Sequence, residues 1–304
     1  MKAFFAFSGQ GAQAVGMGKD IYDNCAAAKA IFDEADAVLG FAISDIIFNG
    51  PAEKLTETRY CQTAIHTMSC AALEAFRARF PQIQPVAAGG LSLGEYAALY
   101  AAGAYSFADG LKLLAERAAF MDEACRETRG AMASVLGGDA DAIKEVAAEC
   151  DIDVANFNSP GQIVISGDAD KVERAIEALK ARGMRKVIPL TVAGAFHSRL
   201  MAKAGEQLAG VLANTALETP AIPVYQNFTA APPASTEELK SNLVNQVAGS
   251  VMWYQSVEKA YAAGADTMIE FGPGNVLTGL LRRTVAEMNG VNINSMESLN
   301  NFAE

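Results

Sequence analysis

The sequence predicts an α/β fold in which a large domain built on a parallel β-sheet is interrupted by a small inserted domain. Three apolar segments with strand character, AFFAFS (3–8), VAAGG (86–90) and DTMIEF (266–271), each run into a glycine turn and a helical pattern. This alternation is typical of a parallel sheet covered by helices. Residues 131–192 instead read as strand, helix, strand, strand, helix and strand. That β-α-β-β-α-β order predicts a ferredoxin-like unit.

The position of the ferredoxin-like unit predicts the domain organisation. The large-domain pattern resumes only after this unit, so we expect a discontinuous large domain over residues 1–128 and 194–304 and a small domain over residues 129–193. A chain of 304 residues is long enough to bury a sizeable core in this arrangement. Because ligand sites often lie between domains, we expect functional residues at the cleft between the two.

The composition favours a folded protein that binds neither nucleic acid nor membranes. Apolar residues make up 51% of the chain, which excludes a disordered protein. The formal net charge of −11 argues against nucleic acid as a partner. No apolar run is long enough for a signal peptide or a membrane span, so we expect a cytoplasmic protein. The five cysteines form no C-x-x-C pair, so we expect reduced thiols and no metal site.

The segment GGLSLGEYAAL (89–99) contains a candidate nucleophile, Ser92. The serine lies between a predicted strand and a predicted helix and has a glycine two positions before and after it, which is the pattern of a nucleophile elbow. The letters SLGE also match a capping box, in which the side chains of Ser92 and Glu95 bind free N–H groups of the helix. We favour the nucleophile, and a capping role for Glu95 is compatible with it.

A serine nucleophile needs a base, and the chain has two histidines. His66 lies within an apolar helical pattern and is expected to be a core residue. His197, in VAGAFHSRLM, follows the last strand of the predicted insert and can face the cleft, although a surface histidine also fits this position. Because no acidic residue stands out as a third member of a triad, a Ser92–His197 dyad oriented by a backbone carbonyl is one possibility.

Arg117 is the candidate residue for substrate recognition. Leu113, Leu114 and Met121 lie three or four positions away, so the guanidinium falls on the apolar stripe of its helix. An internal salt bridge, or snorkelling at the edge of the stripe, would explain Arg117 structurally. The functional alternative is a bidentate contact with a substrate carboxylate, which implies an acyl group that carries a free carboxylate.

Six motifs follow one another along nearly the whole chain: SGQGAQ (8–13), GLSLGEYAAL (90–99), AERAAFM (115–121), ANFNSPGQIVISG (155–167), GAFHS (194–198) and EFGPGNVLTGLLRR (270–283). Together they resemble the motifs of the malonyl-CoA:acyl carrier protein transacylases. The resemblance implies an α/β-hydrolase-like large domain with a ferredoxin-like insert. It also implies transfer of a malonyl group from malonyl-CoA to the phosphopantetheine thiol of an acyl carrier protein, through a malonyl-serine ester.

The resemblance also implies roles for individual residues. Ser92 matches the family's nucleophile, His197 its base and Arg117 the residue that binds the malonyl carboxylate. The backbone N–H groups of Gln10 and Leu93 match the donors of the oxyanion hole.

Four further residues match the family's pocket or lie beside its base. Gln62 matches a pocket glutamine, while Asn156 and Asn158 match residues of the cleft beside the insert; an ordinary polar helix residue and turn-forming asparagines are the structural alternatives. Phe196 resembles the malonyl-type signature of related acyltransferase domains, where its ring would crowd a branched acyl group, but it also fits a core position. Met252 departs from the family, which leaves a main-chain carbonyl near Met252 as the expected partner of His197.

The resemblance implies an acidic acyl carrier protein as partner, malonyl-CoA as substrate, and no metal or separate cofactor. We also expect a monomer. Because this chain is itself acidic, the carrier should dock at a basic patch. ARGMRK (181–186), with Arg182, Arg185 and Lys186, is the preferred patch, and LLRR (280–283) is the second.

Two alternative functions remain open at this point. A serine thioesterase or other hydrolase of acyl thioesters would share Ser92 and His197, but it would give no reason for Arg117 and would usually carry a triad acid. A non-catalytic binding module would leave Ser92 unreactive. Within the resemblance, the carrier protein of fatty-acid synthesis and that of polyketide synthesis are both compatible with the motifs.

Overall fold

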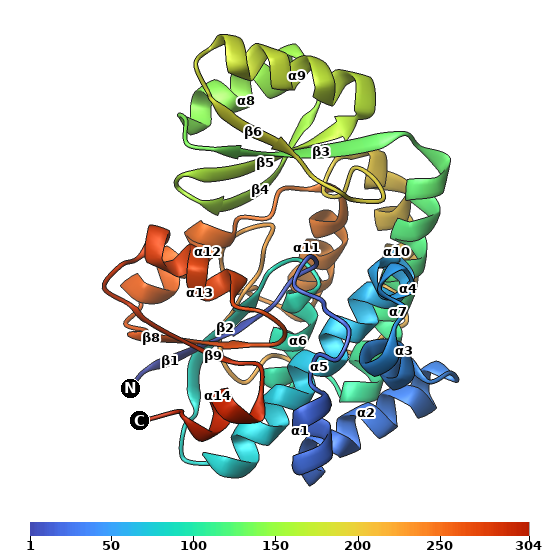
Figure 1. The fold of residues 1–304 in the computed structure, drawn as a ribbon, viewed down its shortest axis with the longest axis vertical. Coiled ribbons are helices and arrows are strands. Elements are labelled where there is room, and N and C mark those ends of the chain that lie inside the picture. Colours follow the sequence, from blue (N-terminus) through green and yellow to red (C-terminus); the bar gives the residue numbers. More distant parts are fainter. Residues whose placement is uncertain (304) are drawn as a thin grey trace.

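The computed structural model describes residues 1–303, which form two β-sheets flanked by helices (Figure 1). The larger sheet is parallel throughout, in the strand order β7 (Val224–Tyr225), β2 (Pro85–Gly90), β1 (Ala3–Phe7), β8 (Thr267–Phe271) and β9 (Asn289–Ile293). The smaller sheet is antiparallel, in the order β4 (Asp153–Ser159), β5 (Gln162–Asp168), β3 (Gly130–Leu136) and β6 (Lys186–Pro189). The predicted fold class is therefore confirmed.

Helices cover both faces of the larger sheet. Those that precede the small sheet in the chain are α1 (Lys19–Asn24), α2 (Ala26–Leu39), α3 (Ile43–Asn49), α4 (Ala52–Thr56), α5 (Thr58–Arg79), α6 (Gly94–Ala101) and α7 (Phe107–Glu127). Those that follow it are the 3₁₀ turn η1 (Arg199–Met201), α10 (Ala202–Ala213), α11 (Thr236–Ala248), α12 (Trp253–Ala262), α13 (Val276–Thr284) and α14 (Met296–Asn300). Within residues 1–303, none of the helices is both long and apolar enough to cross a bilayer.

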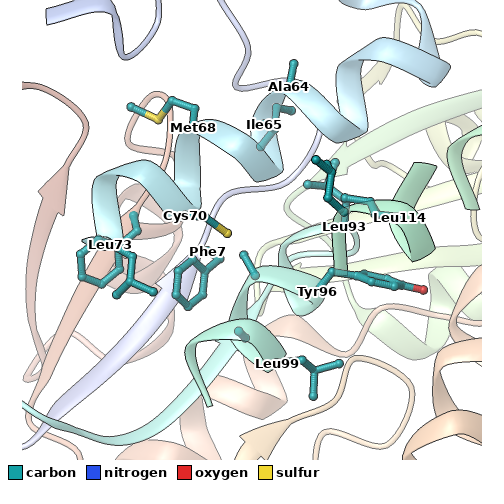
Figure 2. Packing of buried hydrophobic residues seen from close by; sticks show 14 of the residues in the cluster. Phe7, Ala64, Ile65, Met68, Cys70, Leu73, Leu93, Tyr96, Leu99 and Leu114 are labelled. Carbon is teal, nitrogen blue, oxygen red and sulfur yellow. The ribbon is translucent and has the colours of Figure 1, made fainter. Parts of the chain in front are cut away.

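Strand β1 is apolar along its whole length because both of its faces are covered. Side chains alternate across a strand, so Phe5 and Phe7 join the core that contains α5, while Phe4 joins the core formed with α12 and α13. Figure 2 shows the first of these cores, with Phe7 facing side chains of α5 and with Leu93 and Tyr96 beside α7. This packing fixes the carboxyl ends of β1 and β2. Two candidate site residues, Gln10 and Ser92, follow directly after these ends.

The small sheet has the predicted β-α-β-β-α-β order. Its helices, α8 (Ala140–Glu149) and α9 (Ala169–Ala181), pack on the outer face of the sheet, away from the large domain (Figure 1). All of these elements lie within the predicted insert, residues 129–193, whose boundaries remain a prediction. The last predicted strand is shorter than expected: β6 ends at Pro189, although the N–H of Leu190 still donates to Met132 O on β3, and residues 190–193 line a cavity.

Backbone hydrogen bonds and ion pairs are among the contacts that join the small sheet to the large domain. Strand β4 exchanges backbone hydrogen bonds with the segment before α12, from Val251 N to Ala155 O and from Phe157 N to Val251 O. Arg199, just after the predicted base, pairs with Asp153 at 2.9 Å and also with Asp151. The edge of the insert is therefore tied to the segment that carries His197.

Candidate active site

Ser92 lies at a sharp turn between β2 and α6. Its backbone has φ 54°, in the left-handed region that non-glycine residues rarely adopt. A Cβ at Gly90 would lie 2.0 Å from the carbonyl carbon of Gly94, and a Cβ at Gly94 would lie 2.2 Å from the carbonyl oxygen of Phe7. The turn therefore requires glycine at both positions, as the sequence pattern indicates.

The alternative interpretation of SLGE as a capping box is wrong. Helix α6 begins at Gly94 with Leu93 at the N-cap position, and no side chain caps it. The Ser92 hydroxyl instead lies 2.8 Å from Nε2 of His197. The Glu95 carboxylate accepts hydrogen bonds from residues that follow β7 and from α11, so it is not available to the helix terminus.

His197 is held in the tautomer that a base requires. Its Nδ1 lies 2.8 Å from the carbonyl oxygen of Gln246, which can only accept, so Nδ1 carries the proton and Nε2 is left to accept from Ser92. Burial, together with the charge of Arg117, lowers the pKa of His197 to about 4. The imidazole is therefore neutral at physiological pH.

The expectation that His197 would be paired near Met252 is wrong. The partner carbonyl belongs to Gln246, on the last turns of α11. The Met252 carbonyl accepts from the backbone N–H and the hydroxyl of Ser256, at 3.1 and 2.9 Å. The departure of Met252 from the family pattern therefore leaves the backbone partner of His197 unchanged.

His66 has the core position expected for it. It is fully buried, its Nε2 lies 3.6 Å from the Cys70 sulfur, and its ring stacks on Phe107. Burial lowers the pKa of His66 to about 3. It does not line the cavity that contains Ser92.

Arg117 is buried, with 1% of its surface exposed, beside the candidate nucleophile. Its guanidinium donates to the Ser92 hydroxyl at 3.0 Å, to Gln246 Oε1 at 2.9 Å and to the Gln62 side-chain oxygen. Within residues 1–303 no carboxylate forms an ion pair with it, which excludes both the internal salt bridge and snorkelling. Since its acceptors are neutral, Arg117 retains a charge that can bind an anion.

The site opens into a cavity of about 570 Å³ between the two sheets. The predicted site residues that line it are Gln10, Gln62, Ser92, Arg117, Asn156, Asn158, Phe196 and His197. Apolar side chains, among them Met121, Met132 and Val164, form much of the remaining wall. The cavity is therefore large enough for a small acyl group, and its wall combines apolar and polar side chains.

Gln10 and Leu93 flank Ser92 from two loops. A Cβ at Gly9 would lie 2.8 Å from the carbonyl oxygen of Leu91, so the Gln10 loop approaches the elbow as closely as glycine permits. In the described part of the chain, neither the N–H of Gln10 nor that of Leu93 donates to a backbone carbonyl outside the regular elements. Both N–H groups are therefore free to bind a developing oxyanion.

Sequence reasoning missed two residues that hold the elbow, Asn227 and Gln246, and gave a third, Glu95, a capping role. Asn227 Oδ1 accepts from the N–H of Ser92 at 2.6 Å, and Gln246 Nε2 donates to the carbonyl oxygen of Ser92 at 3.1 Å. Glu95 in turn binds both of these residues. The one available signal was the position of Asn227 just after a strand, since polar groups at the carboxyl ends of parallel strands often form sites.

The basic patch ARGMRK lies apart from the Ser92 cavity. Arg182, Arg185 and Lys186 line a second pocket at the ends of α9 and β3, which shares no lining residue with the first. Arg182 is paired with Glu145 and Glu149, at 3.1 and 2.6 Å. Its charge is therefore already offset.

Comparison with known proteins gives one consistent result. A family model described as the acyl transferase domain matches residues 4–300. The chain is 42% identical to the malonyl CoA-acyl carrier protein transacylase of Bacillus subtilis (strain 168), over 98% of this chain and 95% of the relative. It is 38% identical to the protein of the same name from Escherichia coli (strain K12), over 97% of this chain and 96% of the relative.

Solved structures give the same result. The acyl-carrier-protein S-malonyltransferase of Bartonella henselae superposes with a TM-score of 0.94 at 36% identity, covering 99% of this chain and 98% of that one. A malonyl-transacylase in complex with its type II PKS acyl-carrier protein superposes equally well, with a TM-score of 0.94 at 35% identity and with coverage of 99% and 98%.

The burial of His197 predicts the pH dependence of Ser92 reactivity. We expect the rate of Ser92 acylation by p-nitrophenyl acetate to stay high as the pH falls and to drop only near pH 4, where the pKa of His197 lies. In the unfolded chain a histidine binds its proton near pH 6.5, so the free energy of unfolding should decrease as the pH falls from about 6.5 to about 4. Burst kinetics over pH 4–8 measure the acylation rate, and denaturant unfolding over the same range measures the free energy of unfolding. An acylation rate that already falls with an apparent pKa near 6.5 would contradict a buried, neutral imidazole.

Proposed function

Because the chain belongs to the acyl transferase family, we propose that it transfers the malonyl group of malonyl-CoA to the phosphopantetheine thiol of an acyl carrier protein. The relatives named above carry this activity in their names, and one of the structural neighbours is a complex with an acyl-carrier protein. The observation that carries the proposal is Arg117, a buried cation that forms no ion pair with a carboxylate within residues 1–303 and lies 3.0 Å from the Ser92 hydroxyl. A malonyl carboxylate would complete this site.

The first half-reaction loads Ser92. His197 Nε2 takes the hydroxyl proton as Ser92 Oγ forms a bond to the thioester carbonyl carbon, and the N–H groups of Gln10 and Leu93 stabilise the oxyanion. When the tetrahedral intermediate collapses, the C–S bond breaks and the CoA sulfur takes the proton from His197. The products are free CoA and a malonyl ester on Ser92.

The second half-reaction follows the steps of the first in reverse, with the phosphopantetheine thiol of the carrier protein in place of the CoA thiol. The carrier's phosphopantetheine enters the same cavity, His197 takes its thiol proton, and the sulfur forms a bond to the ester carbonyl carbon. Ser92 Oγ then leaves and regains its proton from His197. Both thioesters use one site in turn, and all electron pairs and protons are supplied by the chain and its two substrates, so we propose that no separate cofactor takes part.

The cavity walls define the acyl group that fits. Gln62 and Gln246 hold the guanidinium of Arg117 toward the end of the cavity where Ser92 lies. Phe196, next to the base, lines the same space, and we propose that its ring excludes a branch at the acyl α-carbon. Asn156 and Asn158 line the side formed by the small sheet, where the Oδ1 atom of Asn158 is buried without a partner in residues 1–303 and is available to a substrate N–H or hydroxyl.

The dyad predicts a clear difference between the two histidines. Ser92→Ala should form no malonyl adduct after mixing with malonyl-CoA, as measured by intact-protein mass spectrometry. His197→Ala should slow acylation by about 10²–10⁴-fold, the usual contribution of a general base. His66→Ala, which removes an imidazole equally buried but outside the cavity, is the matched control and should acylate at a near-normal rate. A full malonyl adduct on Ser92→Ala would refute the assignment.

Arg117 predicts the choice of acyl group. Arg117→Ala removes a charge-assisted contact worth on the order of 1.5–3 kcal/mol, so malonyl transfer should fall by about ten- to a hundredfold or more. Acetyl transfer should hold or rise, because an acetyl group brings no carboxylate to be buried unpaired. We would compare kcat/KM for malonyl-, acetyl- and methylmalonyl-CoA in the wild type, Arg117→Ala and Phe196→Ser.

In the same comparison, the wild type should use methylmalonyl-CoA poorly and Phe196→Ser should use it better. Equal losses of malonyl and acetyl transfer in Arg117→Ala would contradict the carboxylate site. Release of CoA without added carrier, at the same rate as with it, would instead indicate a thioesterase.

The carrier should dock at Arg182, Arg185 and Lys186. Reversing the charge of all three should raise the apparent KM for an acidic carrier protein, most strongly at low salt, and should leave acylation by malonyl-CoA unchanged. Since Arg182 is already paired with two carboxylates, the double variant of Arg185 and Lys186 should give most of the effect. An unchanged KM in steady-state transfer assays would exclude this surface.

A further inference from the structure

Glu95 is one of two glutamates that are fully buried within residues 1–303; the other is Glu270. Three N–H donors point at the Glu95 carboxylate. Oε1 accepts from Gln226 Nε2 at 3.0 Å, and Oε2 accepts from the Asn227 backbone N–H at 2.7 Å and from Gln246 Nε2 at 2.9 Å. None of these partners is charged, so Glu95 is not half of an ordinary buried ion pair.

Two of the residues bound by Glu95 hold the Ser92 peptide from opposite sides. The Asn227 side chain accepts from the N–H of Ser92 at 2.6 Å and donates to the carbonyl oxygen of Gly90 at 2.7 Å. The Gln246 side chain donates to the carbonyl oxygen of Ser92 at 3.1 Å. The left-handed backbone conformation of Ser92 costs on the order of 1–3 kcal/mol. The hydrogen bonds with Asn227 and Gln246 stabilise the turn and offset this strain.

Gln246 also contacts the two other main groups of the site. Its carbonyl oxygen accepts from His197 Nδ1, and its side-chain oxygen accepts from Arg117. One residue, itself held by Glu95, therefore positions the nucleophile, the base and the guanidinium.

The chemistry of a carboxylate explains why a glutamate is needed at position 95. An amide side chain can rotate by 180° and exchange its oxygen for its NH₂ group, whereas an ionised carboxylate only accepts hydrogen bonds. Facing Glu95, Gln246 must present its NH₂ group there and its oxygen to Arg117. An amide at position 95 could donate as well as accept, and the orientation of Gln246 would no longer be fixed.

Burial raises the pKa of Glu95 above its ordinary value. The three donated hydrogen bonds and the positive charge of Arg117 act in the opposite direction and favour the ionised carboxylate. The carboxylate thus offsets part of the charge of Arg117 without touching it, and leaves the guanidinium free for a ligand.

We propose that Glu95 is a positioning residue for the transfer reaction, which fixes the orientation of Gln246 and the backbone of Asn227 and through them aligns Ser92, His197 and Arg117. This inference rests on the proposed function only for the identity of the acyl donor. The alignment of Ser92 and His197 applies to any ester that acylates the serine.

The test compares Glu95→Gln with Glu270→Gln. Glu270 is equally buried and accepts two backbone N–H bonds, from Leu277 and Thr278, but it does not line the cavity, so it controls for loss of a buried carboxylate as such. We expect Glu95→Gln to lower the kcat of acylation by about 10–100-fold, the range typical of residues that orient reactive groups. The loss should appear with acetyl-CoA and p-nitrophenyl acetate, because Ser92 and His197 are misaligned, and it should be at least as large with malonyl-CoA, whose carboxylate also depends on the position of Arg117. Glu270→Gln should change the unfolding midpoint but not the acylation rate.

A double-mutant cycle distinguishes positioning from a general loss of packing. Asn227→Ala keeps the backbone N–H that Glu95 accepts and removes only the side chain that holds Ser92. If Glu95 acts through Asn227 and Gln246, the loss in the double variant Glu95→Gln/Asn227→Ala should be smaller than the product of the single losses.

Three outcomes overturn the inference: acylation by Glu95→Gln at the wild-type rate, a loss no larger than in Glu270→Gln, or independent losses in the cycle. If Glu95→Gln does not fold, a wild-type rate in Asn227→Ala overturns it instead. Failure of the proposed function is recognised separately, because the wild type would then react with p-nitrophenyl acetate but not with malonyl-CoA.

Discussion

The left-handed turn at Ser92 is the constraint on which the rest of the site depends. It is possible only because β1, β2 and α6 meet with no side chain at Gly90 or Gly94, so that the elbow rests directly on the end of β1. The continuous apolar sequence of β1, buried on both faces, holds that end in place. The hydroxyl of Ser92 thereby faces His197. Within residues 1–303, the N–H groups of Gln10 and Leu93 donate to no backbone carbonyl outside the regular elements.

Burial sets the electrostatics of the site through three groups: Arg117, His197 and Glu95. The positive charge of Arg117 contributes to the low pKa of His197, and the guanidinium also donates to the Ser92 hydroxyl, which faces Nε2 of His197. Under the proposed function, a substrate carboxylate bound to Arg117 would offset that charge. The pKa of His197 would then be higher with an acyl group that carries a carboxylate than with one that does not.

Local patterns in the sequence were sufficient for the fold class and indicated the candidate nucleophile and base. The strand segments, the order of elements in the insert and the glycines around Ser92 are all set by neighbours within a few positions, and the scarcity of histidine left His197 as the candidate base. Gln246 and Asn227 could not be found in this way, since each acts on Ser92 across more than a hundred residues. The assignment of the His197 partner near Met252 failed for the same reason: which carbonyl on or after α11 reaches the imidazole depends on how that helix packs. The SLGE letters, which suited a cap, gave no indication that Glu95 turns away from its own helix.

The contacts between the insert and the segment that carries His197 couple the positions of these two parts of the chain. Arg199 is two residues beyond the base and is bound to Asp153 on β4, the strand that forms the edge of the small sheet. Because β4 also exchanges backbone hydrogen bonds with Val251, a shift of the small sheet relative to the large domain would be transmitted to the segment that carries the imidazole. The distance between His197 and Ser92 is therefore coupled to the position of the insert.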